Sequence, residues 1–220
     1  MPSKANLRFE DNCGDVGRLL DIHQNLTGNT PGRKWGVEVL NKSAIVLTCA
    51  FWEAYIEDVV AEALDFITSN ITDADKLPIN IRKIVAKAIK QDQNELSPWT
   101  LAGDGWKKVL AGNLNKAKAK YLGNWNSPKT ANIRSLFSDA LGLTDLPAIW
   151  KRPYLTAAQS SRKLDDFVTL RGAIAHRGKP ASAVKKWMVT AALAHVKELV
   201  SFTDSAVNSY VTAATGARLF

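Results

Sequence analysis

The fold of this chain is decided by the stretch from Gly36 to about Asn70, which reads GVEVLNKSAIVLTCAFWEAYIEDVVAEALDFITSN. One face carries apolar residues at the three- and four-residue spacing of a helix: Val39, Leu40, Ala44, Leu47, Ala50, Phe51 and Ala54. The other sides are apolar as well, at Ile45, Val46, Trp52 and Ile56. A helix that is apolar on most of its faces is buried in the centre of a bundle. We therefore predict one long central helix with other helices around it.

Helical spacing continues along nearly the whole chain, without a convincing run of the period-two alternation that marks strands. Glycines and prolines punctuate the gaps, and further helices are predicted at about Phe9 to Leu26, from near Pro78, at Asp104 to Tyr121, Ser127 to Leu141, Ala157 to Arg177 and Ser182 to Thr212. Gly178 and Pro180 between the last two form a strong helix stop, so we expect an antiparallel hairpin. The predicted fold class is all-α, with residues 1–220 in a single domain.

Positive charge is concentrated in the middle of the chain. Residues 76–152 hold 14 Lys and Arg against 5 Asp and Glu, a net charge of +9, whereas the whole chain carries +8. Such a region attracts polyanions over about a Debye length, roughly 8 Å at physiological salt. We interpret it as a basic helical elaboration of the bundle, with nucleic acid as a candidate partner. A solvated basic surface that aids solubility fits the charge balance equally well.

The sequence favours a soluble, cytoplasmic protein without a membrane partner. Its first residues, MPSKANLRFEDNCGD, lack the apolar run of a secretory signal. The longest apolar run, Ala44 to Ile56, falls short of the roughly 20 residues needed to cross a bilayer. Cys13 and Cys49 give no disulfide framework, and we interpret both as reduced thiols. No metal-ligand spacing and no phosphate-binding glycine loop occurs in the sequence, so neither a metal nor a cofactor is expected.

An arginine interrupts the apolar stripe of the penultimate predicted helix. At about 100° per residue, Arg171 falls in the middle of a face formed by Leu164, Phe167, Val168, Ile174 and Ala175. Burying an unpaired guanidinium is costly, so Arg171 must meet a carboxylate, line a cleft or face a partner subunit. The candidate carboxylates on the central helix are Glu53, Glu57 and Asp58. A structural ion pair and a functional site both remain open.

His176 follows Arg171 by five positions, about 140° around the helix. It lies in the last turn, next to Arg177, at the edge of the apolar stripe. An imidazole titrates near neutral pH and suits proton transfer, whereas a guanidinium binds phosphate through paired hydrogen bonds. His23 and His195 have no comparable neighbours, and we interpret them as ordinary helix residues.

The segment Leu164 to Gly178, LDDFVTLRGAIAHRG, resembles the signature of HEPN domains, in which an Arg and a His four to six residues apart form a ribonuclease active site. Three further stretches resemble the RiboL-PSP type of HEPN domain: AFWEAYIEDVVAE at 50–62, GWKKVLAGNL at 105–114 and SPKTANIRSLFSDALGLTDLPAIW at 127–150. Together they span most of the chain in the expected order, which makes the resemblance more specific than the short motif alone.

The resemblance implies a HEPN-like helical bundle and a metal-independent endoribonuclease. Arg171 and His176 would be its catalytic residues, Glu53 would orient them, and Arg177 would bind a neighbouring phosphate. The 2′-OH of RNA would attack the adjacent phosphate and leave 2′,3′-cyclic phosphate and 5′-OH ends. The resemblance also implies a homodimer with the active site at its interface, a role as a toxin or phage-defence effector, and control by a neighbouring antitoxin or regulatory protein.

One position departs from the family pattern, because Gly172 stands where active HEPN motifs often carry a polar residue. The alternative function is therefore a non-catalytic HEPN module that binds RNA or a partner protein, with Arg171 in a structural ion pair. A third alternative is a structural subunit of a larger complex, with only weak, salt-sensitive affinity for nucleic acid.

The basic middle region supplies a separate hypothesis. Five of its lysines are candidates for a surface that tracks RNA: Lys107, Lys108, Lys116, Lys118 and Lys120. Four tryptophans are interleaved with lysines in this region, at Trp99, Trp106, Trp125 and Trp150. Exposed aromatic rings stack on unpaired bases, but tryptophans in such positions more often anchor short helices to a core, and we favour that interpretation.

Overall fold

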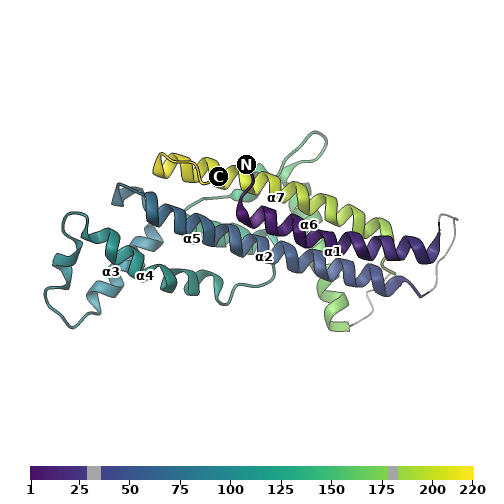
Figure 1. Ribbon diagram of the computed structural model, residues 1–220, viewed down its shortest axis with the longest axis horizontal. Helices are drawn as coiled ribbons and strands as arrows, with labels where there is room; N and C mark the ends of the chain where they lie inside the picture. Colours follow the sequence, from purple (N-terminus) through teal and green to yellow (C-terminus); the bar gives the residue numbers. More distant parts are fainter. Residues whose placement is uncertain (29–35, 178–182) are drawn as a thin grey trace.

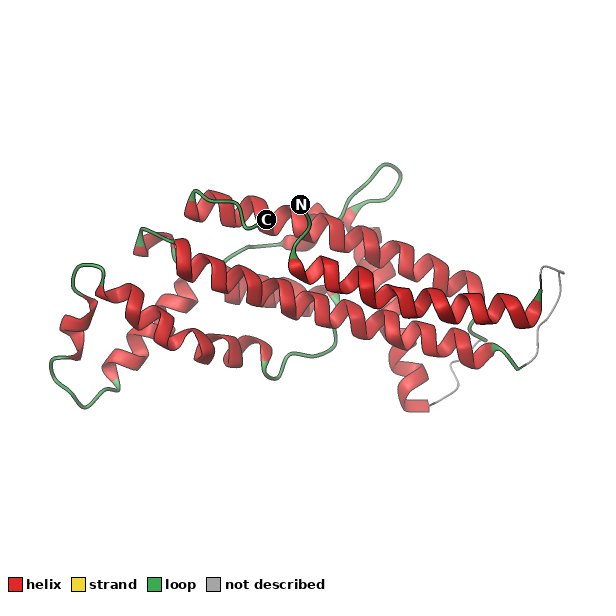
Figure 2. Cartoon of the chain, viewed as in Figure 1, coloured by secondary structure: helices red, strands yellow, loops and turns green. Residues whose placement is uncertain are grey.

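The computed structural model describes residues 1–28, 36–177 and 183–220. In these ranges the chain forms seven α-helices (Figure 1): α1 (Lys4–Thr27), α2 (Glu38–Asn70), α3 (Ile79–Lys90), α4 (Gly105–Leu122), α5 (Thr130–Leu141), α6 (Ala157–Arg177) and α7 (Lys186–Thr215). Short 3-10 helices lie between them: η1 (Ala74–Lys76), η2 (Ser97–Leu101) and η3 (Leu146–Ile149). The described residues contain no strand (Figure 2), so the predicted all-α fold is confirmed.

The central helix is α2, as its sequence predicts. α1 and α7 pack along it, and α4, α5 and α6 also contact it (Figure 1). In the middle of α2 the Trp52 ring stacks on Tyr55 at 5.7 Å and meets the Trp150 ring edge-on at 6.2 Å. The indole N–H of Trp52 donates a hydrogen bond to the carbonyl of Pro128 at 3.2 Å. This aromatic centre fixes the loop before α5 against the middle of α2.

A buried carboxylate ties α7 to the start of α1. Asp204 accepts hydrogen bonds from the backbone N–H of Ser3 at 2.9 Å, the Ser3 hydroxyl at 2.7 Å, the Asn6 amide at 3.0 Å and the Tyr55 hydroxyl at 2.9 Å. Ser3 is also the N-cap of α1, because its Oγ accepts from the Asn6 N–H at 2.9 Å. This cap starts α1 at Lys4, earlier than the sequence predicts, because the polar cap lies outside the apolar pattern.

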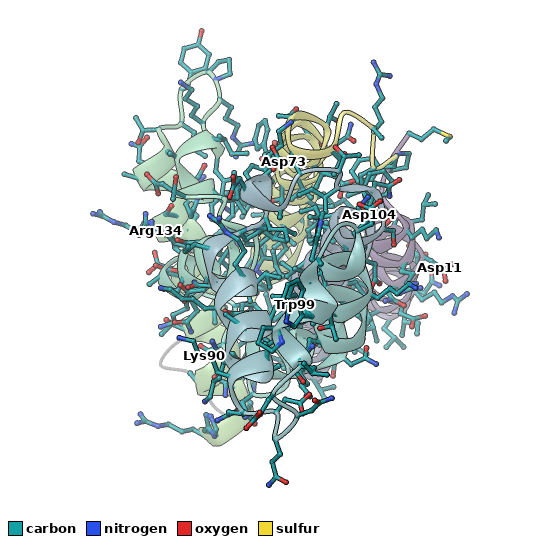
Figure 3. The ribbon with its side chains drawn as sticks, turned by 90° about the vertical axis from the view of Figure 1, so that its left-hand side faces the viewer. Asp11, Asp73, Lys90, Trp99, Asp104 and Arg134 are labelled. Carbon is teal, nitrogen blue, oxygen red and sulfur yellow. The ribbon has the colours of Figure 1, made fainter. Side chains whose placement is uncertain are left out.

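The first part of the basic middle region forms a lobe at one end of the bundle, on the left in Figure 1. We call it the α3–α4 lobe; it comprises α3, η2 and α4. The predicted anchoring of tryptophans is confirmed for Trp150, which is fully buried, and for Trp106 and Trp125, which pack against the core. It is wrong for Trp99, which is 75% exposed and lies at the tip of the lobe (Figure 3). The buried residue of η2 is Ser97, and the indole of Trp99 in the same turn faces solvent.

The predicted start of α5 is corrected by three residues. α5 begins at Thr130 rather than Ser127, because Ser127 has a φ of 58° and therefore lies outside helical geometry. α6 spans the predicted Ala157–Arg177. The predicted helix stop at Gly178 and Pro180 lies outside the described residues, as does the predicted helix start at Ser182.

α6 and α7 pack with opposite chain directions, as the predicted hairpin requires. Near the start of α6, the carbonyl of Ser160 lies 3.0 Å from the Nε2 of His195 in α7. Further along α6, Leu170 shares a hollow with Trp187 at the beginning of α7. None of the helices in the described ranges combines the length and the apolar character that a bilayer span requires.

Candidate active site

The buried face of α6 carries Arg171. Leu164, Phe167, Val168 and Ile174 are buried, as the apolar stripe predicts. Ala175 was assigned to the same stripe but is exposed, because the C-terminal end of α6 projects from the bundle (Figure 1). The side chain of Arg171 retains 25% of its exposure among these apolar neighbours.

Two side chains of α2 hold the guanidinium of Arg171. Its Nε donates a hydrogen bond to Cys49 Sγ at 3.3 Å, and its Nη2 lies 3.6 Å from Glu53 Oε2. Cys49 and Glu53 are one helical turn apart and therefore share a face of α2. Of the three candidate carboxylates, Glu53 is thus the partner, whereas Asp58 pairs with Arg8 at 3.0 Å. The arginine in the apolar stripe has both a carboxylate and a neutral sulfur acceptor.

Glu53 also fixes the loop that precedes α5. Its Oε1 accepts a hydrogen bond from the Ser127 N–H at 3.1 Å. Three residues later, the Thr130 N–H donates to Asp165 Oδ1 on α6 at 2.8 Å. The carboxylate of Asp165 therefore takes one of the unpaired amides at the start of α5. These two contacts join α2, α5 and α6 around Arg171.

A hollow of about 460 Å³ opens between these elements, and we call it the Arg171 hollow. Its wall comes from α2, the loop before α5, and α6: Glu53, Asn126, Ser127, Lys129, Val168, Thr169, Arg171, Gly172 and His176. His176 is exposed, at the edge of the apolar stripe where its spacing predicts it. The structure therefore brings Arg171, His176 and Glu53 to one concave surface.

The guanidinium of Arg171 keeps its charge in the wall of the hollow. The hydrogen bond to Cys49 is the main cause that raises the pKa of Arg171; burial opposes it, and Glu53 adds to it. Burial raises the pKa of the Cys49 thiol, so this group is neutral at pH 7. Because the sulfur is neutral, Glu53 is the group among the described residues whose charge balances that of Arg171.

The wall of the hollow matches the needs of a phosphodiester. Arg171 and Lys129 supply positive charge, Asn126 supplies an amide, and His176 supplies an imidazole. Glu53, the one carboxylate among the described residues of the wall, already accepts the Ser127 N–H and faces the guanidinium. Among the described residues no group of three or more His, Cys, Asp or Glu is arranged to hold a metal ion.

The other predicted site residues lie outside this hollow. Arg177 is exposed at the last residue of α6 and is not among the described residues that line the wall. Its phosphate-binding role stays a prediction.

The five lysines of the predicted RNA surface have different surroundings. Lys107 pairs with Asp104 at 3.0 Å, and Lys118 pairs with Asp65 at 2.5 Å. Lys108 is exposed on α4. Lys116 and Lys120 line a second hollow, between α3 and α4. The structure brings two of the five together there, and their binding of RNA stays a prediction.

Sequence analysis missed Cys49 and the loop residues of the wall. Cys49 was interpreted only as a reduced thiol, although its position one turn before Glu53 could have indicated a contact with the same partner. Ser127 and Lys129 lie at the start of the stretch 127–150 that resembles the family, but no role was predicted for them or for Asn126, and the contacts of this loop with α2 and α6 bring them to the hollow. No local signal in the sequence identifies them.

The family model RiboL-PSP-HEPN matches residues 16–209 of the chain. The matched segment covers most of the sequence and includes every residue that lines the Arg171 hollow. No curated protein shows significant similarity to the chain. No solved structure shows significant similarity to it either.

Proposed function

The chain belongs to the RiboL-PSP-HEPN family, and on that premise we propose that it is a metal-independent endoribonuclease. Arg171 and His176 are its catalytic residues. One observation carries the proposal: both side chains line one hollow, where Cys49 and Glu53 hold the guanidinium. Family membership supports a ribonuclease or RNA-binding role in general, and a held guanidinium in one hollow with an exposed imidazole favours catalysis.

RNA brings its own nucleophile to such a site. The 2′-oxygen forms a bond to the adjacent phosphorus while the bond from phosphorus to the 5′-oxygen breaks. A base takes the proton of the 2′-OH, an acid gives a proton to the 5′-oxygen, and the products are a 2′,3′-cyclic phosphate and a 5′-OH. His176 is the group that transfers the protons, a role in which imidazoles act as general acids and bases. Arg171 binds the phosphate oxygens, whose negative charge increases in the transition state.

Glu53 acts in this scheme as a positioning residue. It touches Arg171 and the loop before α5 rather than the reacting phosphate. Arg177, one residue beyond His176, is the candidate ligand of a neighbouring phosphate.

We include a homodimer in the proposal. Cleavage needs a base and an acid at once, whereas the described residues of one Arg171 hollow include a single histidine. Two copies that join their hollows bring two imidazoles and two guanidiniums to one cleft. At protein concentrations below the dimer dissociation constant, the cleavage rate should then rise with the square of the concentration. A linear rise for a species that sediments as a monomer would contradict the dimeric site.

The primary test is cleavage of total RNA and of a labelled tRNA in EDTA. We expect the wild type to leave 2′,3′-cyclic phosphate ends, and expect His176→Ala and Arg171→Ala to abolish cleavage. Arg162→Ala is the matched control, because Arg162 is exposed on the same helix outside the hollow. RNA with 2′-O-methyl groups should resist cleavage, since it has no free nucleophile. Equal background in all variants would refute the nuclease.

The second candidate function is a non-catalytic HEPN module that binds RNA or a partner protein. The contact of Arg171 with Glu53 favours it, because an ion pair between α6 and α2 can serve structure alone. Gly172, in place of the polar residue frequent in active motifs, also favours it. In the same assay this module would bind RNA, or a partner captured with it, without cleaving either substrate.

A cytoplasmic role as a toxin or phage-defence effector completes the proposal. Induced expression of the wild type should arrest growth and degrade cellular RNA, whereas His176→Ala expressed at the same level should do neither. A protein encoded next to this chain is the expected antitoxin, and its co-expression should restore growth. Equal growth with wild type and variant would remove this role.

A further inference from the structure

The α3–α4 lobe contains a groove whose described lining residues include four lysines and no acidic residue. We call it the lysine groove; its volume is about 380 Å³. α3 contributes Lys83 and Lys87, and α4 contributes Lys116 and Lys120, each pair at a spacing that places both side chains on one helix face. The groove lies between the two helices that project from one end of the bundle (Figure 1).

Three of these lysines have their charge available. Among the described residues, Lys83, Lys87 and Lys116 form no ion pair, whereas two other lysines of α4, Lys107 and Lys118, do. The lobe therefore separates lysines that stabilise it from lysines that face the groove. Like charges placed close together repel, so a groove of this kind is stabilised by an anionic occupant.

A third hollow, which we call the middle hollow, lies between the lysine groove and the loop before α5. It has a volume of about 300 Å³, and its wall combines Lys120, Tyr121, Asn124, Trp125 and Asn126 with the carboxylate of Asp139. Lys120 lines both the lysine groove and this middle hollow. Its Nζ lies 4.8 Å from the centre of the Tyr121 ring. Amide and aromatic side chains therefore line the surface next to the lysines.

The middle hollow in turn meets the Arg171 hollow. Asn126 lines both of them. The three hollows therefore form one series along the surface, from the lysines of the α3–α4 lobe, past Tyr121 and Trp125, to Arg171 and His176.

We propose that this series is a binding track for single-stranded RNA, which continues from the candidate active site to the lysine groove. The inference rests on the proposed function for the direction of the strand, but the track itself is a binding site that stands without cleavage. Lysines bind the phosphates, and the aromatic and amide side chains of the middle hollow contact bases. A single strand suits the track, because only unpaired bases offer their faces and edges to such side chains.

The lysine groove is tested with a charge-matched pair of variants. The groove variant is Lys83→Ala, Lys87→Ala and Lys116→Ala. The control variant is Lys76→Ala, Lys90→Ala and Lys151→Ala, three exposed lysines of the same basic region that are not among the described residues lining the three hollows. Both lower the net charge of the chain by the same amount. Binding is measured with 2′-O-methyl single-stranded RNA, which cannot be cleaved by 2′-OH attack.

The groove variant should change the salt dependence of binding. Each phosphate contact on a single strand contributes about −0.7 to the slope of log K against log salt, so loss of three contacts flattens the slope by about 2. Between about 50 and 200 mM salt, the wild type should then lose about 20-fold more affinity than the groove variant. The control variant should keep the wild-type slope. Equal slopes for both variants would show that only net charge matters and would overturn the groove.

Oligonucleotide length tests whether the track is continuous. Wild-type affinity should rise as the RNA is lengthened from one that fills only the Arg171 hollow, and this rise should be absent in the groove variant. The same rise in both variants would overturn the track. Polyglutamate that competes as well as RNA, with the same dependence on the groove, would assign the groove to an acidic protein instead.

The two proposals fail separately. If the wild type cleaves a short oligonucleotide but gains nothing from the lysine groove, the track is wrong and the nuclease stands. If the length and salt effects appear on 2′-O-methyl RNA while no RNA is cleaved, the nuclease is wrong and the track stands.

Discussion

Replacing Arg171 with methionine is expected to cost RNA cleavage far more than folding stability. Methionine keeps the apolar stem of the side chain in the stripe and removes the charge. The ion pair with Glu53 spans 3.6 Å, and both side chains are 25% exposed. Exposed pairs contribute about 0–1 kcal/mol and breaking a buried pair costs about 3–5 kcal/mol, so this pair lies between, at about 1–2 kcal/mol. The variant stays folded, because domains are stable by about 5–15 kcal/mol.

The catalytic cost is larger, because the guanidinium interacts most strongly with the charge of the transition state. Loss of one such donor lowers the rate about 100- to 1000-fold, which corresponds to about 3–4 kcal/mol. Glu53→Gln separates the two roles of the pair. Gln keeps an oxygen that accepts the Ser127 N–H and removes only the negative charge next to Arg171.

The assay is a double-mutant cycle read out twice, by urea unfolding and by the rate of RNA cleavage. Arg171→Met, Glu53→Gln and the double variant should show a coupling free energy of about 1 kcal/mol in unfolding. In cleavage, Arg171→Met should lose far more activity than Glu53→Gln. The reasoning is refuted if Arg171→Met lowers the free energy of unfolding by about 3–5 kcal/mol and cleavage falls only in proportion to the unfolded fraction.

Three further outcomes are expected. Burial lowers the pKa of His195 from its ordinary 6.5, so the unfolded chain binds more protons below pH 6.5 and stability falls on acidification; His195→Gln should reduce this fall in urea unfolding between pH 7 and pH 5. Asp204→Asn leaves donors facing an amide in the buried network at the start of α1 and should lower the free energy of unfolding by about 3 kcal/mol, measured by urea denaturation. Gly172→Ala should raise the free energy of unfolding by up to about 1 kcal/mol, because Ala favours a helix more than Gly does and the added Cβ meets no atom within 4 Å. Differential scanning calorimetry should then show a higher Tm.

Most of the fold could be predicted, because long helices repeat their signal over many turns. α2 and α6 follow the predicted ranges closely for that reason. The errors fall where one polar contact or one backbone angle decides a boundary. The cap by Ser3 extends α1, and the positive φ of Ser127 delays α5. Neither changes the apolar pattern from which the helices were predicted.

The candidate site could be predicted only in part. Arg171 can be identified as a candidate site residue from a single sequence, because a charged side chain in an apolar stripe needs a partner. The sequence narrows that partner to three carboxylates, and the way α6 crosses α2 selects Glu53. The position of Cys49 one turn before Glu53 indicates a shared helix face, but its hydrogen bond could not be predicted, since a buried cysteine has the same sequence pattern whether or not its sulfur accepts one.

Gly172 is the departure from the family pattern that most affects the proposed activity, and its surroundings change how it is interpreted. Packing does not require a glycine, because a Cβ would meet no neighbour within 4 Å, and its backbone is not among the positive-φ glycines. Gly172 instead lines the Arg171 hollow, and its lack of a side chain leaves more space there. Asn126 and Lys129 stand in the same wall and offer an amide and an ammonium group to a ligand. We infer that the loop before α5 replaces the frequent polar residue, so the glycine widens the site without removing its means of holding a phosphate.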